Sequence, residues 1–234
     1  MFGLFKKKLD GSEVLKGFTD RHSHLLPGVD DGFKKIEDTL TALEIIEHAG
    51  VSDVWFTPHI MEDVPNKPDD LRRRFEDVKK IYKGGLTLHL AAEHMLDNLF
   101  IKRLANDELL TMEDDMLLVE TSYYNPPMEF DGLLGDIMNK GYRPLLAHPE
   151  RYKYMDFAKY KELKNRGIKF QMNLGSIAGG YGEEAKMKAE KLLKLGYYDF
   201  AGSDIHSVKH LTNIYNAPIK KSVLERVMQI GQNK

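Results

Sequence analysis

The chain has 234 residues, of which 42% are hydrophobic and 30% are charged, and this composition is ordinary for a globular protein. Its 34 basic and 36 acidic residues leave a formal net charge of −2, which gives no bulk attraction to nucleic acid. The absence of cysteine excludes disulfides, and it excludes phosphatases and proteases that use a thiolate nucleophile.

The first 15 residues are predicted to be a flexible segment that precedes the domain proper. The apolar residues Phe2, Leu4 and Phe5 come before the lysines Lys6–Lys8, which is the wrong order for a signal peptide. These apolar residues and lysines can touch a membrane surface, but a solvated, partly frayed N-terminus is the simpler explanation for this sequence. No stretch approaches the ~18 uninterrupted apolar residues of a membrane span. We therefore expect a cytoplasmic protein without stable membrane insertion.

The rest of the chain alternates short β-rich runs with helical stretches. The first strand is predicted to end near Asp20. Further strands are predicted over 51–57, 86–92, 116–120, 144–147, 168–173 and 198–201. Helices are predicted over 37–48, 69–82, 133–140, 158–166, 183–195 and 223–230, and several of them are stopped by a glycine. This alternation predicts parallel βα units and a single α/β domain over residues 1–234.

Histidines and carboxylates recur where these strands end. Six of them lie at or just past the C-terminal end of a predicted strand: His22, His59, Glu93, Glu120, His148 and Asp204. In a parallel barrel those strand ends meet on one face, where the active site lies. Residues far apart in the chain are therefore expected to share one pocket.

The residue types at these positions predict a metal site. Imidazole and carboxylate together are the ligands that divalent metals bind. His22 and His24 are two residues apart, so on a strand both rings point to the same side and can bind one ion. A cluster of two or three such ions suits hydrolysis at phosphorus, because the ions lower the pKa of a bound water and stabilise the leaving oxygen.

Arg151 is a candidate phosphate contact, because a guanidinium group grips phosphate bidentately. It lies three residues after His148, in the same predicted loop. The plainer alternative for this side chain is a surface ion pair with Glu150.

Four further histidines have simpler explanations and are expected not to bind metal. His48 lies near a helix C-terminus, where a cation suits the helix dipole. His89 alternates with apolar residues and is expected to face the helices, whereas His94 points away from the pocket if its strand continues. His210 is expected to open or flank a surface helix.

Three other stretches are conspicuous. Arg72–Arg74 lies among acidic residues and is predicted to be a solvated helix face. Gly175–Gly180 lacks the Lys-Ser/Thr ending of a nucleotide-binding loop and is predicted to be a tight connection beside the metal pocket. Tyr123–Pro127 follows Glu120 and either lines the pocket mouth or packs on the barrel rim, and both explanations stay open.

In combination and in order, these motifs resemble those of the PHP (polymerase and histidinol phosphatase) metal-dependent phosphoesterases. Within them, the chain resembles the bacterial tyrosine-protein phosphatases of capsular and exopolysaccharide gene clusters. The resemblance rests on Asp-Arg-His-Ser-His…Asp-Asp-Gly (20–32), Thr-Pro-His (57–59), Ala-Glu (92–93), Ala-His-Pro-Glu-Arg-Tyr (147–152), Asn-Leu-Gly-Ser (173–176) and Ser-Asp-Ile-His (203–206). Arg21, Ile60 and Ser207 depart from the usual family residues, but none of them removes a ligand.

The resemblance implies a distorted TIM-like (β/α)7 barrel of the PHP type that holds two or three divalent metal ions. Manganese is the expected ion, with iron, zinc or magnesium as alternatives. The implied ligands are His22, His24, Glu93 and Asp204 for one ion, Glu93, Glu120 and His148 for a second, and Asp31, His59 and His206 for a third. Arg151 falls where the family places a phosphate-binding arginine. The sequence does not name the acid that protonates the leaving group, and a metal-bound water, His59 and His206 are its candidates.

The implied activity is that of a protein-tyrosine phosphatase, a phosphoric monoester hydrolase. Its expected substrate is a phosphotyrosine protein such as the tail of a bacterial tyrosine kinase that controls capsule or exopolysaccharide synthesis. A small-molecule phosphatase, for example a histidinol phosphatase, would use the same metal site with a different pocket rim. A third hypothesis is a non-catalytic binding module that keeps its metals for stability. A homo-oligomer is compatible with the sequence.

Overall fold

The computed structural model describes residues 6–9 and 14–232. Most of the segment predicted to be flexible, including Phe2, Leu4 and Phe5, lies outside the described residues, whereas Leu9 and Leu15 are fully buried in the core. Where that segment is described, β1 (Lys6–Lys7) pairs antiparallel with β11 (Ile219–Lys220). No helix in the described part of the chain is long and apolar enough to cross a membrane.

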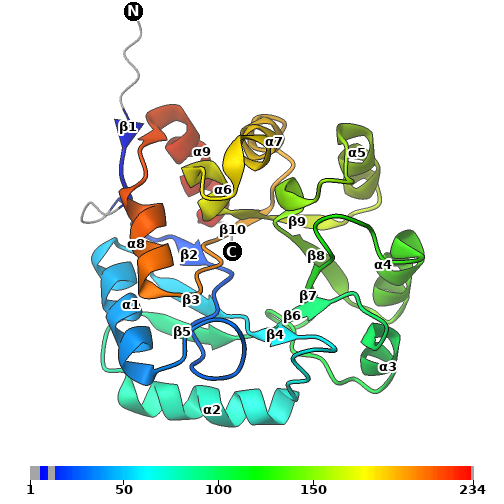
Figure 1. Ribbon diagram of the computed structural model, residues 1–234, viewed down its shortest axis with the longest axis horizontal. Coiled ribbons are helices and arrows are strands. Elements are labelled where there is room, and N and C mark those ends of the chain that lie inside the picture. The colour runs from blue at the N-terminus through cyan, green and yellow to red at the C-terminus, as the bar shows by residue number, and fades with distance from the viewer. Residues whose placement is uncertain (1–5, 10–13, 233–234) are drawn as a thin grey trace, which may run out of the picture.

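Parallel strands form a ring, and helices cover its outside (Figure 1). The strands are β2 (Thr19–Asp20), β3 (Asp53–Phe56), β4 (His59–Ile60), β5 (Thr87–Leu90), β6 (Glu93–Met95), β7 (Met116–Glu120), β8 (Arg143–Ala147), β9 (Lys169–Asn173) and β10 (Phe200–Gly202). They pair in the orders β2-β3-β5 and β10-β9-β8-β7-β6-β4. Because β4 follows β3 and β6 follows β5 after short breaks, these nine strands occupy seven positions around the ring.

The ring closes between its first and last strands. The main-chain nitrogen of Arg21, just past β2, donates to the carbonyl oxygen of Ala201 in β10 at 3.1 Å. The nitrogen of Asp204 donates to the carbonyl oxygen of His22 at 2.7 Å. At the opposite junction between the two sheets, β6 pairs with β7, whereas β5 has no pairing with β7 among the described residues. The expectation of a distorted, TIM-like (β/α)7 barrel is therefore confirmed.

Successive side chains of each strand point alternately into the barrel and toward the helices. This alternation separates a small interior cluster from a larger core under the helices. The interior cluster consists of Trp55, Ala91, Met112, Met116, Leu118, Leu145, Ala147 and Phe200. Leu117, Val119 and Leu146 alternate with members of that cluster and belong to the larger core instead. Apolar side chains therefore fill part of the barrel, and the positions two residues further along the same strands face the same interior.

The helices follow the strands. They are α1 (Ile36–His48), α2 (Pro68–Ile81), α3 (Phe100–Ala105), α4 (Phe130–Asn139), α5 (Phe157–Asn165), α6 (Leu174–Ala178), α7 (Gly182–Lys194), α8 (Val208–Asn216) and α9 (Lys221–Gly231), with a 3-10 turn η1 (Pro149–Arg151). In α2, Pro68 occupies the first turn, where its missing N–H costs no hydrogen bond. Leu71, Phe75 and Val78 form the buried face of this helix.

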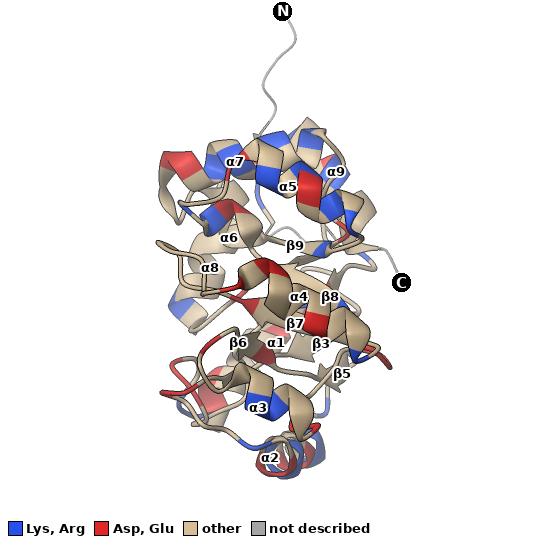
Figure 2. Cartoon of the chain, turned by 90° about the vertical axis from the view of Figure 1, so that its right-hand side faces the viewer, with Lys and Arg blue, Asp and Glu red and all other residues tan. Residues whose placement is uncertain are grey.

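The surface of the outer helices carries mixed charge. Basic and acidic residues are interspersed on the face shown in Figure 2. The side chains of Arg72 and Arg73 are exposed and pair with Asp69 and Asp70 of the same helix turn. The prediction that Arg72–Arg74 is a solvated helix face is therefore confirmed.

The longer predicted elements are confirmed, with ends shifted by a few residues. The short elements β1, α3, α6 and β11 were not predicted, because so few residues show no hydrophobic period. The stretch Gly175–Gly180 contains most of α6 in addition to the tight turn that was expected. His210 lies in α8, in agreement with the surface helix predicted around it.

Candidate metal centre

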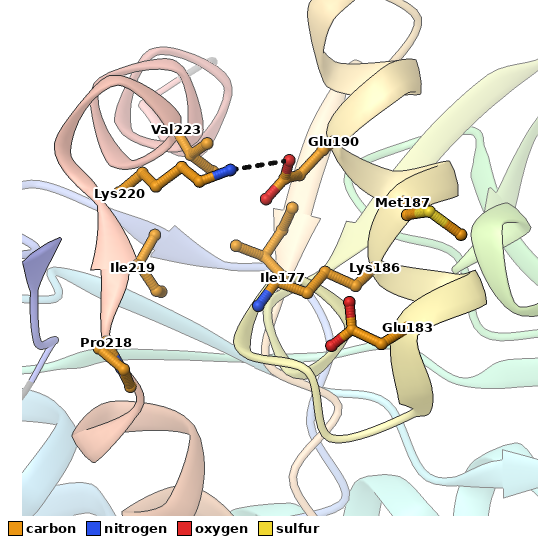
Figure 3. Close-up of a pocket in the computed structure, with 9 residues that line it drawn as sticks. All are labelled: Ile177, Glu183, Lys186, Met187, Glu190, Pro218, Ile219, Lys220 and Val223. Atoms are coloured by element: carbon orange, nitrogen blue, oxygen red, sulfur yellow. Dashed lines mark hydrogen bonds and ion pairs between the residues drawn. The ribbon is translucent and has the colours of Figure 1, made fainter. Parts of the chain in front are cut away.

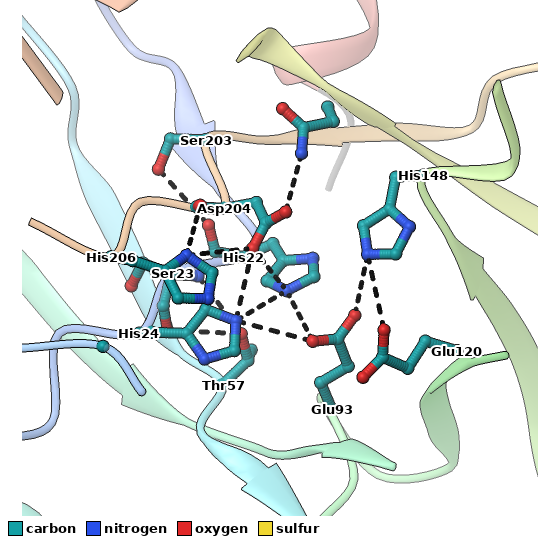
Figure 4. Close-up of polar contacts among 12 residues, drawn as sticks. His22, Ser23, His24, Thr57, Glu93, Glu120, His148, Ser203, Asp204 and His206 are labelled. Carbon is teal, nitrogen blue, oxygen red and sulfur yellow. Dashed lines mark hydrogen bonds and ion pairs between the residues drawn. The ribbon is translucent and has the colours of Figure 1, made fainter. Parts of the chain in front are cut away.

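Polar side chains occupy the interior positions at the C-terminal ends of the strands. Glu120 follows Met116 and Leu118 at a spacing of two, and Glu93 follows Ala91 at the same spacing. Because alternate residues of a strand face the same side, the carboxylate of Glu120 enters the barrel next to the apolar cluster. Glu93 opens β6 just after the break that contains Ala91, and its buried carboxylate enters the same interior. Figure 4 shows these two side chains pointing toward the surrounding histidines.

His148 reaches the interior through an unusual backbone conformation. It directly follows the interior residue Ala147, so a regular strand would turn its ring outward. Its φ of 34° lies in the left-handed region, and the ring places Nε2 3.0 Å from Glu93 Oε1. Asp204 also has a positive φ, of 53°. Such strained non-glycine residues concentrate at functional sites.

Close packing of β10 fixes the position of His22. A Cβ atom on Gly202 would lie 2.4 Å from the Cβ of His22 and 2.7 Å from its main-chain nitrogen. Glycine alone leaves room for this approach, which brings the end of β10 against the segment just past β2 that carries His22.

All nine residues that the sequence suggested as metal ligands occur in four overlapping groups whose ligand atoms lie within 4.8 Å of one another. The groups are His24, Asp31, His59 and His206; His22, His24 and Glu93; His22, His148 and Asp204; and His59, Glu93 and Glu120. On the outer side, His59 Nε2 and His206 Nε2 each lie 3.5 Å from Asp31 Oδ1. The Asp31 side chain is 69% exposed, so the centre opens to solvent there.

In the inner part of the centre, nitrogen and oxygen atoms face a common space. His22 Nε2 lies 3.2 Å from His24 Nε2 and 3.2 Å from Glu93 Oε2. His24 Nε2 lies 3.3 Å from Asp204 Oδ1. The two rings and the two carboxylates are all buried (Figure 4).

Several buried polar atoms of this centre make no hydrogen bond with any residue that the structure describes. They are His59 Nδ1, Glu93 Oε2, Glu120 Oε1 and His148 Nδ1. His59 Nδ1 lies 3.2 Å from Glu93 Oε2 and 3.1 Å from Glu120 Oε1, so three of these atoms face one another. A buried polar atom without a partner costs about 1–3 kcal/mol. One nitrogen and two carboxylate oxygens fit a divalent metal ion, which would satisfy all three atoms.

Two side chains orient the inner histidines. Asp30 Oδ2 lies 2.8 Å from His24 Nδ1, and Gln171 Oε1 lies 3.0 Å from His22 Nδ1. With Nδ1 engaged, both rings present Nε2 to the centre, as supporting residues do in metal sites. Sequence reasoning missed both roles. The available signals were the pair Asp30-Asp31 and the position of Gln171 two residues before the end of a strand.

The carboxylates dominate the electrostatics of the centre. Burial opposes protonation of His22, but Glu93 and Asp204 outweigh it and raise the pKa of His22 to about 9. Burial by itself would raise the pKa values of Glu93 and Asp204, yet the surrounding histidines hold both pKa values well below their usual range. The centre therefore attracts positive charge, whether it comes from protons or from divalent ions.

Arg151 stands at the edge of the centre. Its Nη1 donates to Asp204 Oδ2 at 2.8 Å. Its Cζ lies 4.3 Å from the ring centre of Tyr123 and 3.9 Å from that of Tyr181. Glu150, the alternative partner for this arginine, is buried and accepts hydrogen bonds from a main-chain nitrogen and a tyrosine hydroxyl. The guanidinium is therefore directed toward the metal centre.

Comparison with known proteins places the chain in a family. Residues 18–222 match the family described as "Capsular polysaccharide synthesis, CpsB/CapC". The chain belongs to the CpsB/CapC family. It is 29% identical over 197 residues to the tyrosine-protein phosphatase YwqE of Bacillus subtilis, covering 81% of this chain and 78% of that protein. It is 29% identical over 225 residues to the putative tyrosine-protein phosphatase CapC of Staphylococcus aureus, covering 92% and 88%.

Solved structures support the same fold for this CpsB/CapC chain. One match comes from a study of YwqE from Bacillus subtilis and CpsB from Streptococcus pneumoniae, described as metal-dependent tyrosine phosphatases. It has a TM-score of 0.77 at 24% identity and covers 92% of this chain and 95% of that one. A lactonase from Listeria monocytogenes matches with a TM-score of 0.52 at 10% identity, covering 96% and 88%. These likenesses concern the fold alone.

The four remaining histidines of this CpsB/CapC chain lie outside the four ligand groups. His48 is exposed at the end of α1, and His89 is half-buried on β5. His94 is fully buried, and burial lowers its pKa to about 4, which keeps its ring neutral at physiological pH. His210 lies near the centre, because its Nδ1 accepts a hydrogen bond from the main-chain nitrogen of His206 at 3.4 Å.

A cavity of about 320 Å³ lies between α7 and the segment of β11 and α9 (Figure 3). Two lysines and two glutamates line it, and Glu190 faces Lys220 at 3.5 Å. None of the nine candidate ligands lines this cavity. It is therefore separate from the metal centre.

Proposed function

We propose that this CpsB/CapC chain is a metal-dependent phosphatase that hydrolyses phosphotyrosine in proteins. One observation carries the proposal: buried ligand atoms of His59, Glu93 and Glu120 face one another without a hydrogen-bond partner among the described residues. Arg151 contacts Asp204 of the same centre. A cluster of divalent ions next to a guanidinium is the charge arrangement that holds a phosphoryl group. The names of the relatives, tyrosine-protein phosphatases, support tyrosine as the phosphorylated residue.

The metal ligands that we assign share one property: each offers a nitrogen or oxygen atom to the common space in the barrel. They are His22, His24, Asp31, His59, Glu93, Glu120, His148, Asp204 and His206. Four overlapping groups fit two or three divalent ions, because four residues each belong to two groups: His22, His24, His59 and Glu93. Manganese is our first choice, with iron, zinc or magnesium as alternatives.

The ions and the side chains of the protein have different roles in the proposed hydrolysis. Divalent ions in such a cluster supply Lewis-acid activation of water and neutralise the phosphoryl charge. Arg151 binds phosphoryl oxygens with the N–H groups that Asp204 does not use, and this contact orients the ester for in-line attack. The rings of Tyr123 and Tyr181 flank the guanidinium and limit its movement.

His59 and His206 are our candidates for delivering a proton to the leaving oxygen, and each can do so only from a ring nitrogen that does not bind an ion. Both rings stand on the side of the centre where Asp31 is exposed, so they lie between the inner ligands and solvent. The side chain of His206 is 28% exposed, and its Nδ1 lies 2.9 Å from the carbonyl oxygen of Asp204. This hydrogen bond leaves His206 Nε2 directed toward Asp31.

The substrate that we infer is the phosphorylated tail of a bacterial tyrosine kinase that controls capsule or exopolysaccharide synthesis. The description of the family supports the link to capsular polysaccharide. We place the reaction in the cytoplasm. The mixed surface charge favours no nucleic acid partner.

The function is tested with purified protein, added Mn²⁺ and a phosphotyrosine peptide. We expect phosphate release by the wild type and its loss in a His22→Ala, His148→Ala double variant, because two of the four groups lose members. His48→Ala is the matched control, because this exposed histidine lies outside the groups. Activity that survives in the double variant shows that the site is assigned wrongly.

A further inference from the structure

A second cavity, of about 270 Å³, lies directly beside Arg151. Tyr123, Tyr124 and Tyr181 contribute to its lining, together with the small side chain of Ala185. The lining comes from the loop after β7, from η1 and from the region where α7 begins, which are far apart in the sequence. The barrel therefore builds this aromatic cavity next to the residue that we assign to phosphate binding.

Arg151 connects the metal centre with the cavity. Nη1 bonds to Asp204 in the centre, and the guanidinium also lines the cavity. An arginine carries five N–H donors, and in the described part of the chain no other side chain accepts a hydrogen bond from this one. A phosphoryl group held between the ions and Arg151 would direct its organic group along the guanidinium into the cavity.

Two walls of the cavity are held in place by packing. The ring of Tyr123 packs against the ring of His148, with centroids 5.9 Å apart. The ring of Tyr181 lies so close to Gly175 that a Cβ atom there would be 2.8 Å from its Cε2. These rings form a preorganised surface, because neither can move without disturbing its neighbour.

Tyr124 forms the rim. Its side chain is 64% exposed, which is unusual for a large aromatic residue. The ammonium group of Lys153 lies 4.6 Å from its ring centre and steadies the ring at the cavity mouth. An exposed ring held in this way offers a face on which another aromatic ring can stack.

We propose that Tyr124, together with the wall of Tyr123, forms a subsite for the aromatic ring of the substrate and so selects phosphate esters of phenols over those of aliphatic alcohols. The inference rests on the proposed phosphatase function. Both Tyr123 and Tyr124 line this cavity beside Arg151, which favours a pocket-lining role for this loop.

The experiment compares two peptides of otherwise identical sequence, one with phosphotyrosine and one with phosphoserine. The ratio of their kcat/KM values is measured with the manganese-loaded wild type and with Tyr124→Ala, Tyr124→Phe and Met128→Ala. Comparing ratios between variants cancels the difference in intrinsic reactivity of the two esters. Met128 is the matched control, because it lies on the same loop, is 90% exposed and lines a different cavity.

Loss of one aromatic stacking partner is expected to lower the tyrosine-to-serine ratio about 3- to 10-fold in Tyr124→Ala. Tyr124→Phe keeps the ring and should keep the ratio, as should Met128→Ala. An unchanged ratio in an active Tyr124→Ala variant, or an equal fall in Met128→Ala, overturns the subsite and leaves the phosphatase function intact. Failure of the wild type to hydrolyse either peptide overturns the proposed function, and the subsite with it.

Discussion

At the scale of single residues, Asp30 holds two neighbouring ligands in position. Its Oδ2 lies 2.8 Å from His24 Nδ1 and accepts a hydrogen bond from the nitrogen of His59 at 3.1 Å. Its Oδ1 accepts from the nitrogen of Gly32 at 2.9 Å. The buried carboxylate thus fixes the orientation of His24 without belonging to any ligand group.

Asp30→Asn should weaken metal binding, because the amide cannot stabilise the proton on His24 Nδ1 as a carboxylate does. We expect the dissociation constant for Mn²⁺, measured by calorimetry, to rise about 10- to 100-fold. Asp63→Asn, a change at an exposed aspartate, is the control and should bind as the wild type does. Wild-type affinity in Asp30→Asn would contradict a positioning role.

The pKa of His22 predicts how the stability of the metal-free protein depends on pH. Since that pKa is raised from 6.5 to about 9 in the folded state, protonation of His22 stabilises the fold fully below pH 6.5. This contribution is lost as the pH rises through 9. We expect the Tm of chelator-treated protein to fall between pH 6.5 and 9, and to fall less in His22→Gln. A Tm that is flat over this range in the wild type would contradict the account.

The ligand residues could be predicted because their signal is local in the sequence. Each of three carboxylates follows a hydrophobic run. Glu120 ends β7, Asp204 lies two residues past β10, and Glu93 opens β6 just after the predicted strand 86–92. The roles of Asp30 and Gln171 could not be predicted. Each depends on which ring nitrogen the side chain meets across the barrel, and no local pattern records that contact.

At the scale of elements, the contact of β10 with the segment just past β2, which carries His22, sets the geometry of the centre. Gly202 permits this contact, because any larger residue would overlap His22. The seven strand positions and most helices followed from hydrophobic periods and stop signals. The breaks that separate β3 from β4 and β5 from β6 could not be predicted from these signals. They arise because each half of the strand pairs with a different sheet.

Gly202→Ala should destabilise the protein by about 1–3 kcal/mol, the usual cost of overpacking a tight contact. It should also weaken metal binding, because His22 must move away. Gly135→Ala in α4 is the matched control, since no atom lies within 4 Å of its added Cβ and alanine favours a helix. Denaturant unfolding measures the free energy of unfolding of both variants. Equal stability of the two variants would refute the importance of this contact.

At the scale of the whole molecule, barrel closure turns separate motifs into one centre. The parallel fold and the face that bears the ligands could be predicted, because strands and helices alternate along the chain. The resemblance implied ligand sets that share Glu93, with His59 and Asp31 in one set. The folded chain also brings His59 next to Glu120, which the resemblance assigned to another set. Such distances depend on how far the barrel is distorted, and sequence patterns do not encode this.

The central claim is that divalent ions held by this cluster are required for hydrolysis of phosphotyrosine. The most direct test strips the protein of metal and then measures phosphate release from a phosphotyrosine peptide as Mn²⁺ is added in known equivalents. The account predicts no activity in the stripped protein and a rise that ends at two or three ions per chain. Activity in the stripped protein equal to that of the loaded protein would contradict it.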